Sequence, residues 1–93
     1  MKSLYMANCT EYEAGWGQRP DGFKLALTLE VMRAEIMKDD AMGSSNCYWR
    51  HDTPQEVMCD DDIYEAILKD MGEKKFVNYS DKKKKELHLY KKL

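Results

Sequence analysis

The sequence predicts an α+β domain, in which a small, mainly antiparallel sheet carries two amphipathic helices packed on one face. Short runs that alternate apolar and polar residues are typical of half-buried strands, and two longer runs repeat apolar residues at helical spacing. Turn-forming residues separate these runs, and 43% of the chain is hydrophobic, which is enough for one modest core. Residues 1–93 are therefore expected to form a single domain with a lysine-rich C-terminal segment at 80–93.

The first two strands are expected at residues 3–10 and 23–27, where "SLYMANCT" and "FKLAL" alternate apolar and polar side chains. Between them, residues 12–23 read "YEAGWGQRPDGF". Its Arg-Pro-Asp-Gly stretch at 19–22 is a strong turn signal, because proline fixes φ, aspartate accepts a local hydrogen bond and glycine tolerates positive φ. The two strands are therefore predicted to pair as an antiparallel hairpin with a long loop.

The first helix is predicted over residues 28–42. Thr28 is a good N-cap, because its hydroxyl can accept a hydrogen bond from a free backbone N–H of the first turn. Gly43 is a natural stop. The apolar face repeats at helical spacing through Leu29, Met32 and Ile36.

The second helix is predicted over residues 62–71, where Asp62 and Glu65 match the capping-box pattern and Gly72 ends the helix. Three consecutive aspartates at 60–62 favour a helix N-terminus rather than a calcium loop, because calcium loops place their carboxylates at alternate positions. The apolar stripe of this helix consists of Ile63, Tyr64, Ile67, Leu68 and Met71.

Residues 43–55 are interpreted as a loop, since they combine glycine, serine, asparagine and proline with an aromatic pair. Short strands are expected on either side of the second helix, at 56–59 and 75–80. The predicted order is therefore ββαβαβ, followed by the lysine-rich segment.

Two interpretations stay open for the lysine-rich segment. In the first, Ser80 caps a helix that places Leu89, Tyr90 and Leu93 on one side. In the second, the segment is a strand in which Leu87 and Leu89 point inward. Its helix-favouring composition makes the helix the preferred prediction.

Charge is distributed unevenly along the chain. Residues 1–73 carry 7 Lys and Arg against 15 Asp and Glu, whereas residues 74–93 carry 8 lysines against Asp81 and Glu86. An acidic body with a basic end indicates two electrostatically distinct surfaces. The lysines at 82–85, 91 and 92 could contact phosphates, so nucleic-acid binding is an alternative function, which the acidic body disfavours.

Three cysteines, Cys9, Cys47 and Cys59, are an odd number in a chain whose first residues lack the apolar run of a signal peptide. Reduced thiols and a cytoplasmic location are therefore expected. No apolar run approaches the roughly 20 residues of a membrane helix, so no membrane partner is expected.

No catalytic set stands out in the sequence. Cys47, His51 and Cys59 are residue types that zinc prefers, but their spacing lacks the compactness of structural zinc sites, and a surface histidine beside two buried cysteines is the simpler interpretation. A phosphate loop, a serine elbow and a metallohydrolase motif are all missing from the sequence. The sequence therefore predicts a protein that is not an enzyme and needs no cofactor, while zinc stays open.

The candidate binding surface lies in the glycine-rich segment and the 43–55 loop. Tryptophan, tyrosine and arginine contribute disproportionately to interface energies, and loops on a rigid scaffold concentrate binding residues. Whether the two tryptophans belong to the core or to an interface stays open. The predicted partner-binding residues, which should meet at one end of the sheet, are Trp16, Arg19, Asp21, Tyr48, Trp49 and Arg50.

Four segments resemble small accessory proteins carried mainly by bacteriophages: "AGWGQRPDGF", "LALTLEVMRAEI", "YWRHDTPQEV" and "DDDIYEAILKD". The resemblance covers about residues 10–72 and leaves out the lysine-rich end. It implies no catalytic residues. It implies a protein that binds and blocks a host protein or a defence system in the cytoplasm of an infected bacterium.

Sequestration of a nucleotide-like ligand is a further alternative. Trp16, Tyr48 or Trp49 could stack on a base, and Arg19, Arg50 or the C-terminal lysines could bind phosphate. A homo-oligomer is also compatible with the sequence.

Overall fold

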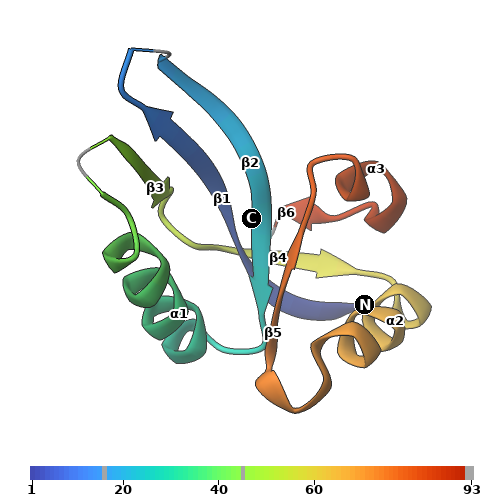
Figure 1. Cartoon of the computed structure of the whole chain (residues 1–93). Coiled ribbons are helices and arrows are strands. Elements are labelled where there is room, and N and C mark those ends of the chain that lie inside the picture. The colour runs from blue at the N-terminus through green and yellow to red at the C-terminus, as the bar shows by residue number, and fades with distance from the viewer. Residues whose placement is uncertain (16, 45, 92–93) are drawn as a thin grey trace.

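The computed structural model describes residues 1–15, 17–44 and 46–91, and its strands form one six-stranded antiparallel sheet (Figure 1). The predicted α+β class with a small antiparallel sheet and two main helices is confirmed. The elements follow one another as β1 (Lys2–Glu13), β2 (Gly17–Ala26), α1 (Leu29–Ala41), β3 (Cys47–His51), β4 (Gln55–Cys59), α2 (Asp61–Met71), the 3-10 helix η1 (Gly72–Lys74), β5 (Phe76–Tyr79), α3 (Lys83–Leu87) and β6 (Tyr90–Lys91).

The two main helices begin and end close to where the sequence predicts. The hydroxyl oxygen of Thr28 accepts a hydrogen bond of 3.2 Å from the backbone N–H of Val31, which caps α1. Asp61 and Asp62 occupy the first turn of α2, where their negative charges interact favourably with the helix dipole. Gly72 ends α2 with a φ of +60°.

β1 is the central strand of the sheet. It pairs with β2 along one edge and with both β3 and β4 along the other. Lys2–Met6 pair with β4, whereas Cys9–Glu13 pair with β3. The remaining strands complete the order β5-β2-β1-β4-β6.

The 43–55 segment is not the predicted loop, because it contains β3 and the first residue of β4. β1 extends to Glu13, beyond its predicted end, and its last residues offer an edge on which this segment can pair. Aromatic side chains such as Tyr48 and Trp49 favour a strand once such an edge exists. A strand is therefore added to the predicted element order.

Between β3 and β4, Asp52 lies beside Asn8 of β1 and is hydrogen-bonded to it, which bridges the interruption in strand pairing along this edge of β1. The backbone N–H of Asn8 donates to Asp52 Oδ1 over 2.8 Å, and its side-chain amide donates to Oδ2 over 2.9 Å. The backbone N–H of Asp52 donates in return to the carbonyl oxygen of Asn8 over 3.0 Å. These three hydrogen bonds hold the two strands in line along one edge of β1.

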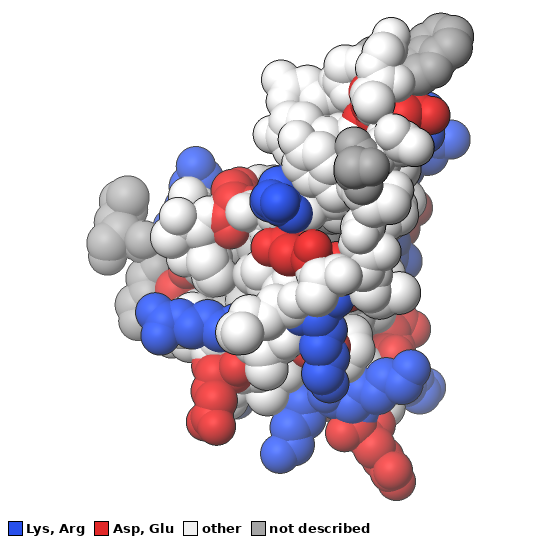
Figure 2. Space-filling view, turned by 60° about the vertical axis from the view of Figure 1, so that its left-hand side comes forward, with Lys and Arg blue, Asp and Glu red and all other residues white. Residues whose placement is uncertain are grey.

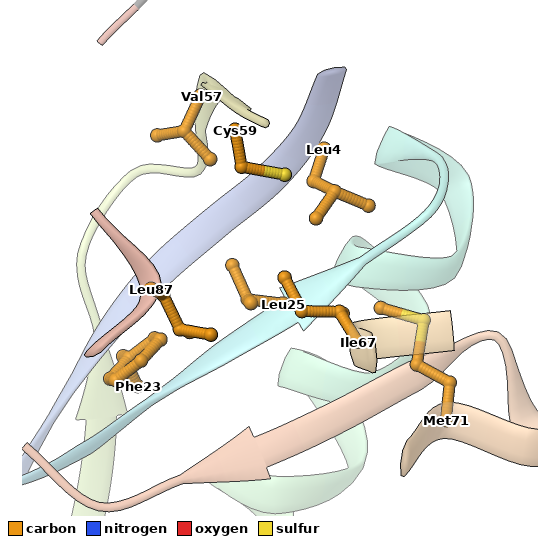
Figure 3. Packing of buried hydrophobic residues seen from close by; sticks show 8 residues of the cluster. All are labelled: Leu4, Phe23, Leu25, Val57, Cys59, Ile67, Met71 and Leu87. Atoms are coloured by element: carbon orange, nitrogen blue, oxygen red, sulfur yellow. The ribbon is translucent and has the colours of Figure 1, made fainter. Parts of the chain in front are cut away.

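The main core lies between the sheet, α2 and α3, as Figure 3 shows. Each of its side chains is at most 4% exposed, so each contributes on the order of 2 kcal/mol of hydrophobic stabilisation. The cluster consists of Leu4, Phe23, Leu25, Val57, Cys59, Ile67, Met71 and Leu87.

A second, smaller core lies on the opposite face of the sheet, beneath α1. Ala7 of β1 and Ala26 of β2 pack there against Met32 of α1. Successive side chains of a strand point to opposite faces, so Ala26 and Leu25 belong to different cores. α1 and α2 therefore lie on opposite faces of the sheet (Figure 1), which corrects the expectation that both cover one face. Alanine is only weakly hydrophobic, so these two positions did not indicate a second core in the sequence. Their small side chains leave room for α1 to pack on the sheet.

The lysine-rich segment is part helix and part strand, which corrects the prediction of one helix capped by Ser80. α3 is short, and its last residue, Leu87, is 4% exposed in the main core. His88 then adopts a left-handed conformation with a φ of +49°, which reverses the chain into β6. β6 pairs with β4, and Leu93 lies outside the described residues.

The outer parts of three strands extend beyond the two cores as an arm, which we define as Cys9–Glu13, Gly17–Asp21 and Cys47–His51. The molecule measures 42 × 25 × 24 Å, and Figure 1 shows the arm rising from the body. On the face that Figure 2 shows, the upper lobe is mainly white, whereas acidic and basic side chains are interspersed over the body. The arm is therefore distinct from the body in shape.

β2 contains a bulge at the base of the arm. Its register against β1 shifts between Asn8 and Thr10, so that Asp21 and Gly22 together lie opposite Cys9. Gly22 has a φ of +79°, and a Cβ atom at this position would collide with the carbonyl oxygen of Tyr79. Glycine is thus required here by backbone conformation and by space.

Gly22→Ala should lower the free energy of unfolding by about 3 kcal/mol, because left-handed strain adds to displacement of the β5 backbone. Gly15→Ala is the matched control, since Gly15 has a φ of +85° but open space around it, and it should cost only about 1 kcal/mol. Urea denaturation of both variants measures the difference. Equal losses would contradict the close packing of β5 on the bulge.

Candidate functional site

A cavity of about 810 Å³ lies beside the bulge, at the base of the arm. Its walls come from the bulge itself, the C-terminal end of α1, β3, and residues 78–82, which are the end of β5 and the segment after it. β5 pairs with β2 only as far as Phe23, so no described strand covers the outer edge of β2 where the cavity opens. The bulge and the end of β5 together create the space.

The cavity adjoins a buried lysine. Lys24 is 0% exposed, and its Nζ lies 2.8 Å from Asp39 Oδ2 and 2.9 Å from Asn78 Oδ1. The same Nζ lies 4.8 Å from the centre of the Phe76 ring, which adds a cation–π contact. A buried charge is tolerated only when it is paired and hydrogen-bonded, and these contacts meet that condition.

His51 extends this cluster across the end of α1. Its side chain is 2% exposed, with Nδ1 3.4 Å from Asp40 Oδ1 and Nε2 3.8 Å from Asp39 Oδ2. Asp39 and Asp40 lie in the last turn of α1, where negative charge opposes the helix dipole. Lys24 therefore compensates the charge of Asp39 at the end of the helix, and His51 contacts both carboxylates.

Lys24 and Asp39 were missed as candidate residues by the sequence analysis, although both left a signal. Lys24 lies between the apolar residues Phe23 and Leu25, and two consecutive aspartates at the end of a helix are unfavourable without a cationic partner. Either anomaly indicates a compensating charge elsewhere in the chain. Only the sheet register identifies which charge it is.

Cys9 lies in the cavity wall, and its thiol is mostly protonated at neutral pH. Burial raises its pKa to about 11, and the charges of Asp21, Asp39 and Asp40 add to that effect against the opposing charge of Lys24. Because the thiolate is the nucleophile, Cys9 and His51 do not form an activated pair at neutral pH.

The pKa values of the other two thiols are raised as well. Burial is the main cause for both, supported by the charge of Glu11 beside Cys47 and of Asp60 beside Cys59.

The structure separates the candidate zinc residues. Cys59 belongs to the main core beneath α2, whereas His51 lies on the α1 side of the sheet. Cys47 is at the far end of β3 from His51. Within residues 1–15, 17–44 and 46–91, no three His, Cys, Asp or Glu side chains gather where they could hold a metal ion.

The structure places the predicted partner-binding residues in the arm, divided between its two faces. Arg19 and Trp49 lie in one row across the strands, each opposite Glu11, and the Arg19 guanidinium lies 2.9 Å from Glu11 Oε1. Trp49 and Asp21 line the cavity. Trp16 lies outside the described residues.

Tyr48 and Arg50 point to the other face of the arm, because side chains alternate along β3. The Tyr48 ring stacks on Tyr12 with 5.1 Å between ring centres and 11° between planes. The Arg50 guanidinium lies 4.7 Å from the centre of the Tyr48 ring. An ordered stack of an arginine and two tyrosines thus covers this face.

No protein-family model matches the chain, and the searches of curated proteins and of solved structures found no match either. Of the helices in the part of the chain that the structure describes, none has the length and hydrophobicity needed to cross a bilayer. Function is therefore inferred from the geometry of the arm and its cavity.

Asp39→Asn should lower the free energy of unfolding by about 3 kcal/mol, because it leaves the buried Lys24 ammonium without a carboxylate. Lys24→Met should cost less, about 1 kcal/mol, since the remaining Asp39 side chain is 32% exposed and can be hydrated. Glu35→Gln, which breaks a surface pair with Lys38, is the control and should change stability by less than about 0.5 kcal/mol. Guanidinium denaturation measures the free energy of unfolding of each variant. A loss for Asp39→Asn no larger than that for Glu35→Gln would contradict a stabilising role of the Lys24–Asp39 pair.

Cys9 should be alkylated slowly at about pH 8, with a thiolate fraction roughly a hundredfold below that of a thiol in the unfolded chain. Its rate should keep rising up to a pH of about 11. The folded state favours the protonated thiol, so this group's contribution to stability is present below about pH 9 and is lost towards pH 11. Iodoacetamide labelling followed by peptide mass spectrometry measures the rate, with the urea-unfolded chain as control. A midpoint near that of the unfolded chain would refute the assignment.

Proposed function

We propose that the protein is a small non-catalytic binding protein that inhibits or modulates a bacterial host protein, such as a defence protein or a protein that a phage takes over. The resemblance to phage accessory proteins supports the host as the source of the partner. Such a partner would be met in the cytoplasm of the infected cell.

The arm is the observation that carries this proposal. It presents Tyr48 and Arg50 on one face and Trp49 on the other, and these residue types dominate the energy of protein interfaces. The three side chains project from paired strands rather than from a loop, so little conformational entropy is lost when they are buried by a partner. A lobe that projects from the body is also easily reached by a large molecule (Figure 2).

The chemistry of the cavity supports binding rather than catalysis. One nucleophile in its wall, Cys9, is a protonated thiol at neutral pH. Lys24 and His51 both contact the carboxylates at the end of α1, at 2.8 Å and 3.4 Å. These contacts tie both side chains to the fold.

The two alternative functions are less well supported by the contacts. In the lysine run, Lys83 pairs with Glu86 at 3.1 Å, and the Lys84 Nζ is bonded to Asn8 Oδ1 and lies 5.3 Å from the centre of the Phe23 ring. These lysines are committed to the fold, which weakens the case for a phosphate-binding tail. A nucleotide in the cavity would meet the carboxylates of Asp21, Asp39 and Asp81, which oppose its phosphates.

Tyr48→Ala and Trp49→Ala should each weaken binding of the partner about 30-fold, which corresponds to about 2 kcal/mol, while the chain stays folded. The partner is first captured from a bacterial lysate on the immobilised chain and identified by mass spectrometry. The purified partner is then titrated with each variant by calorimetry, which also gives the stoichiometry. Unfolding curves establish that each variant is folded.

Tyr90→Ala is the matched control, because Tyr90 is an exposed tyrosine on β6, away from the arm, with 53% of its surface accessible. It should bind the partner with the affinity of the unchanged chain. If Tyr48→Ala and Trp49→Ala both kept full affinity for the partner, the interface would lie outside the arm. Capture of nucleic acid in place of protein would favour the alternative function of the lysine-rich segment.

A further inference from the structure

The cavity at the base of the arm has an aromatic wall and an acidic rim. Trp49, Phe23 and Tyr79 come to it from three different strands, and Met42 at the end of α1 is 77% exposed. A space of about 810 Å³ exceeds what one side chain fills, so the tip of a partner loop can enter with its flanking residues. The site combines apolar surface with charge, which favours an amphipathic occupant.

The three carboxylates of the cavity differ in how far they are already engaged. Asp39 pairs with Lys24, and Asp81 accepts a 3.3 Å hydrogen bond from the backbone N–H of Gly22. Among the described residues, Asp21 has neither an ion pair nor a hydrogen bond, and it is exposed at the bulge. Asp21 is therefore the carboxylate most available to a ligand.

Carboxylates outnumber cationic side chains among the residues that line the cavity. Cys9, in its wall, is affected by Asp21, Asp39 and Asp40, whose charges raise the pKa of the thiol against the opposing charge of Lys24. Lys82 is the cation at the rim, and it forms no ion pair within the described part of the chain. A positively charged group entering the cavity would be attracted by the aspartates and repelled by Lys82.

We propose that the cavity receives an arginine side chain of the protein partner, with its guanidinium against the Trp49 ring and paired with the Asp21 carboxylate. This inference rests on the proposed function and names the chemistry of the partner. A guanidinium suits the site better than an ammonium, because its planar, weakly hydrated group stacks on aromatic faces and donates two parallel hydrogen bonds to a carboxylate. Charge complementarity excludes an anionic group from the same position.

N-acetyl-arginine amide is the probe, and its binding is followed by NMR through the indole N–H resonance of Trp49, assigned with Trp16→Phe. The arginine probe should shift this resonance in a saturable way at millimolar concentration. N-acetyl-citrulline amide, which has the same shape without the charge, should bind at least about fivefold more weakly. N-acetyl-lysine amide should fall between the two.

Three variants locate the charge. Asp21→Asn should weaken the arginine probe about fivefold, and Lys82→Gln should strengthen it about twofold by removing the competing cation. Asp62→Asn makes the same charge change in α2 and should leave binding unaltered. Because Asp21→Asn and Lys82→Gln shift the affinity in opposite directions, misfolding of one variant cannot imitate the result.

Equal binding of arginine and citrulline would overturn the proposal, as would an affinity that Asp21→Asn and Lys82→Gln leave unchanged. Stronger binding of AMP than of arginine would also overturn it and would assign the cavity to a phosphate ligand. The probe is a free amino-acid derivative, so this result is independent of any captured partner. Failure of the arginine site is thereby distinguished from failure of the proposed function.

Discussion

The buried ammonium of Lys24 is the constraint on which the rest of the structure depends. A lysine with no exposed surface in the second strand of a sheet needs a carboxylate within reach, and Asp39 at the end of α1 provides it at 2.8 Å. That pair fixes which face of the sheet α1 covers and how far along the strands it lies. It also holds the end of α1 beside β3, where His51 meets Asp40.

Two irregularities of the sheet occur at the same level of β1, and together they separate the body from the arm. On one edge the β2 bulge lies opposite Cys9, and on the other edge the break between β3 and β4 lies opposite Asn8. The C-terminal segment fastens both: Asp81 accepts the backbone N–H of Gly22, and the Lys84 Nζ is bonded to Asn8 Oδ1. The lysine-rich segment, for which the sequence predicts a helix, thus connects both irregularities at the base of the arm.

This arrangement explains how an acidic body and a basic end coexist without forming two separate surfaces. Lysines of α3 reach acidic and amide groups nearby, and Figure 2 shows charges of both signs interspersed over the body. The carboxylates of Asp21, Asp39 and Asp81 line the cavity together with the half-buried Trp49. A site of that kind, on paired strands at the base of a projecting lobe, is well suited to recognising a protein.

The sequence by itself determined the local structure. Thr28, Gly72 and the stripe of α2 specified the two main helices, and the alternation of "FKLAL" specified a strand, because capping and periodicity act between residues close in the chain. It also placed Arg19, Tyr48 and Trp49 at one end of the sheet, although their role in binding stays a prediction.

Only the tertiary structure decided the rest, because it depends on contacts between residues far apart in the chain. The strand character of β3 depends on an edge of β1 that lies about 40 residues away. The opposite faces of α1 and α2 depend on two alanines and a buried lysine that carry no helix signal. The cavity depends on the bulge, on the end of β5 and on α1 meeting at one place, and no local pattern encodes that meeting.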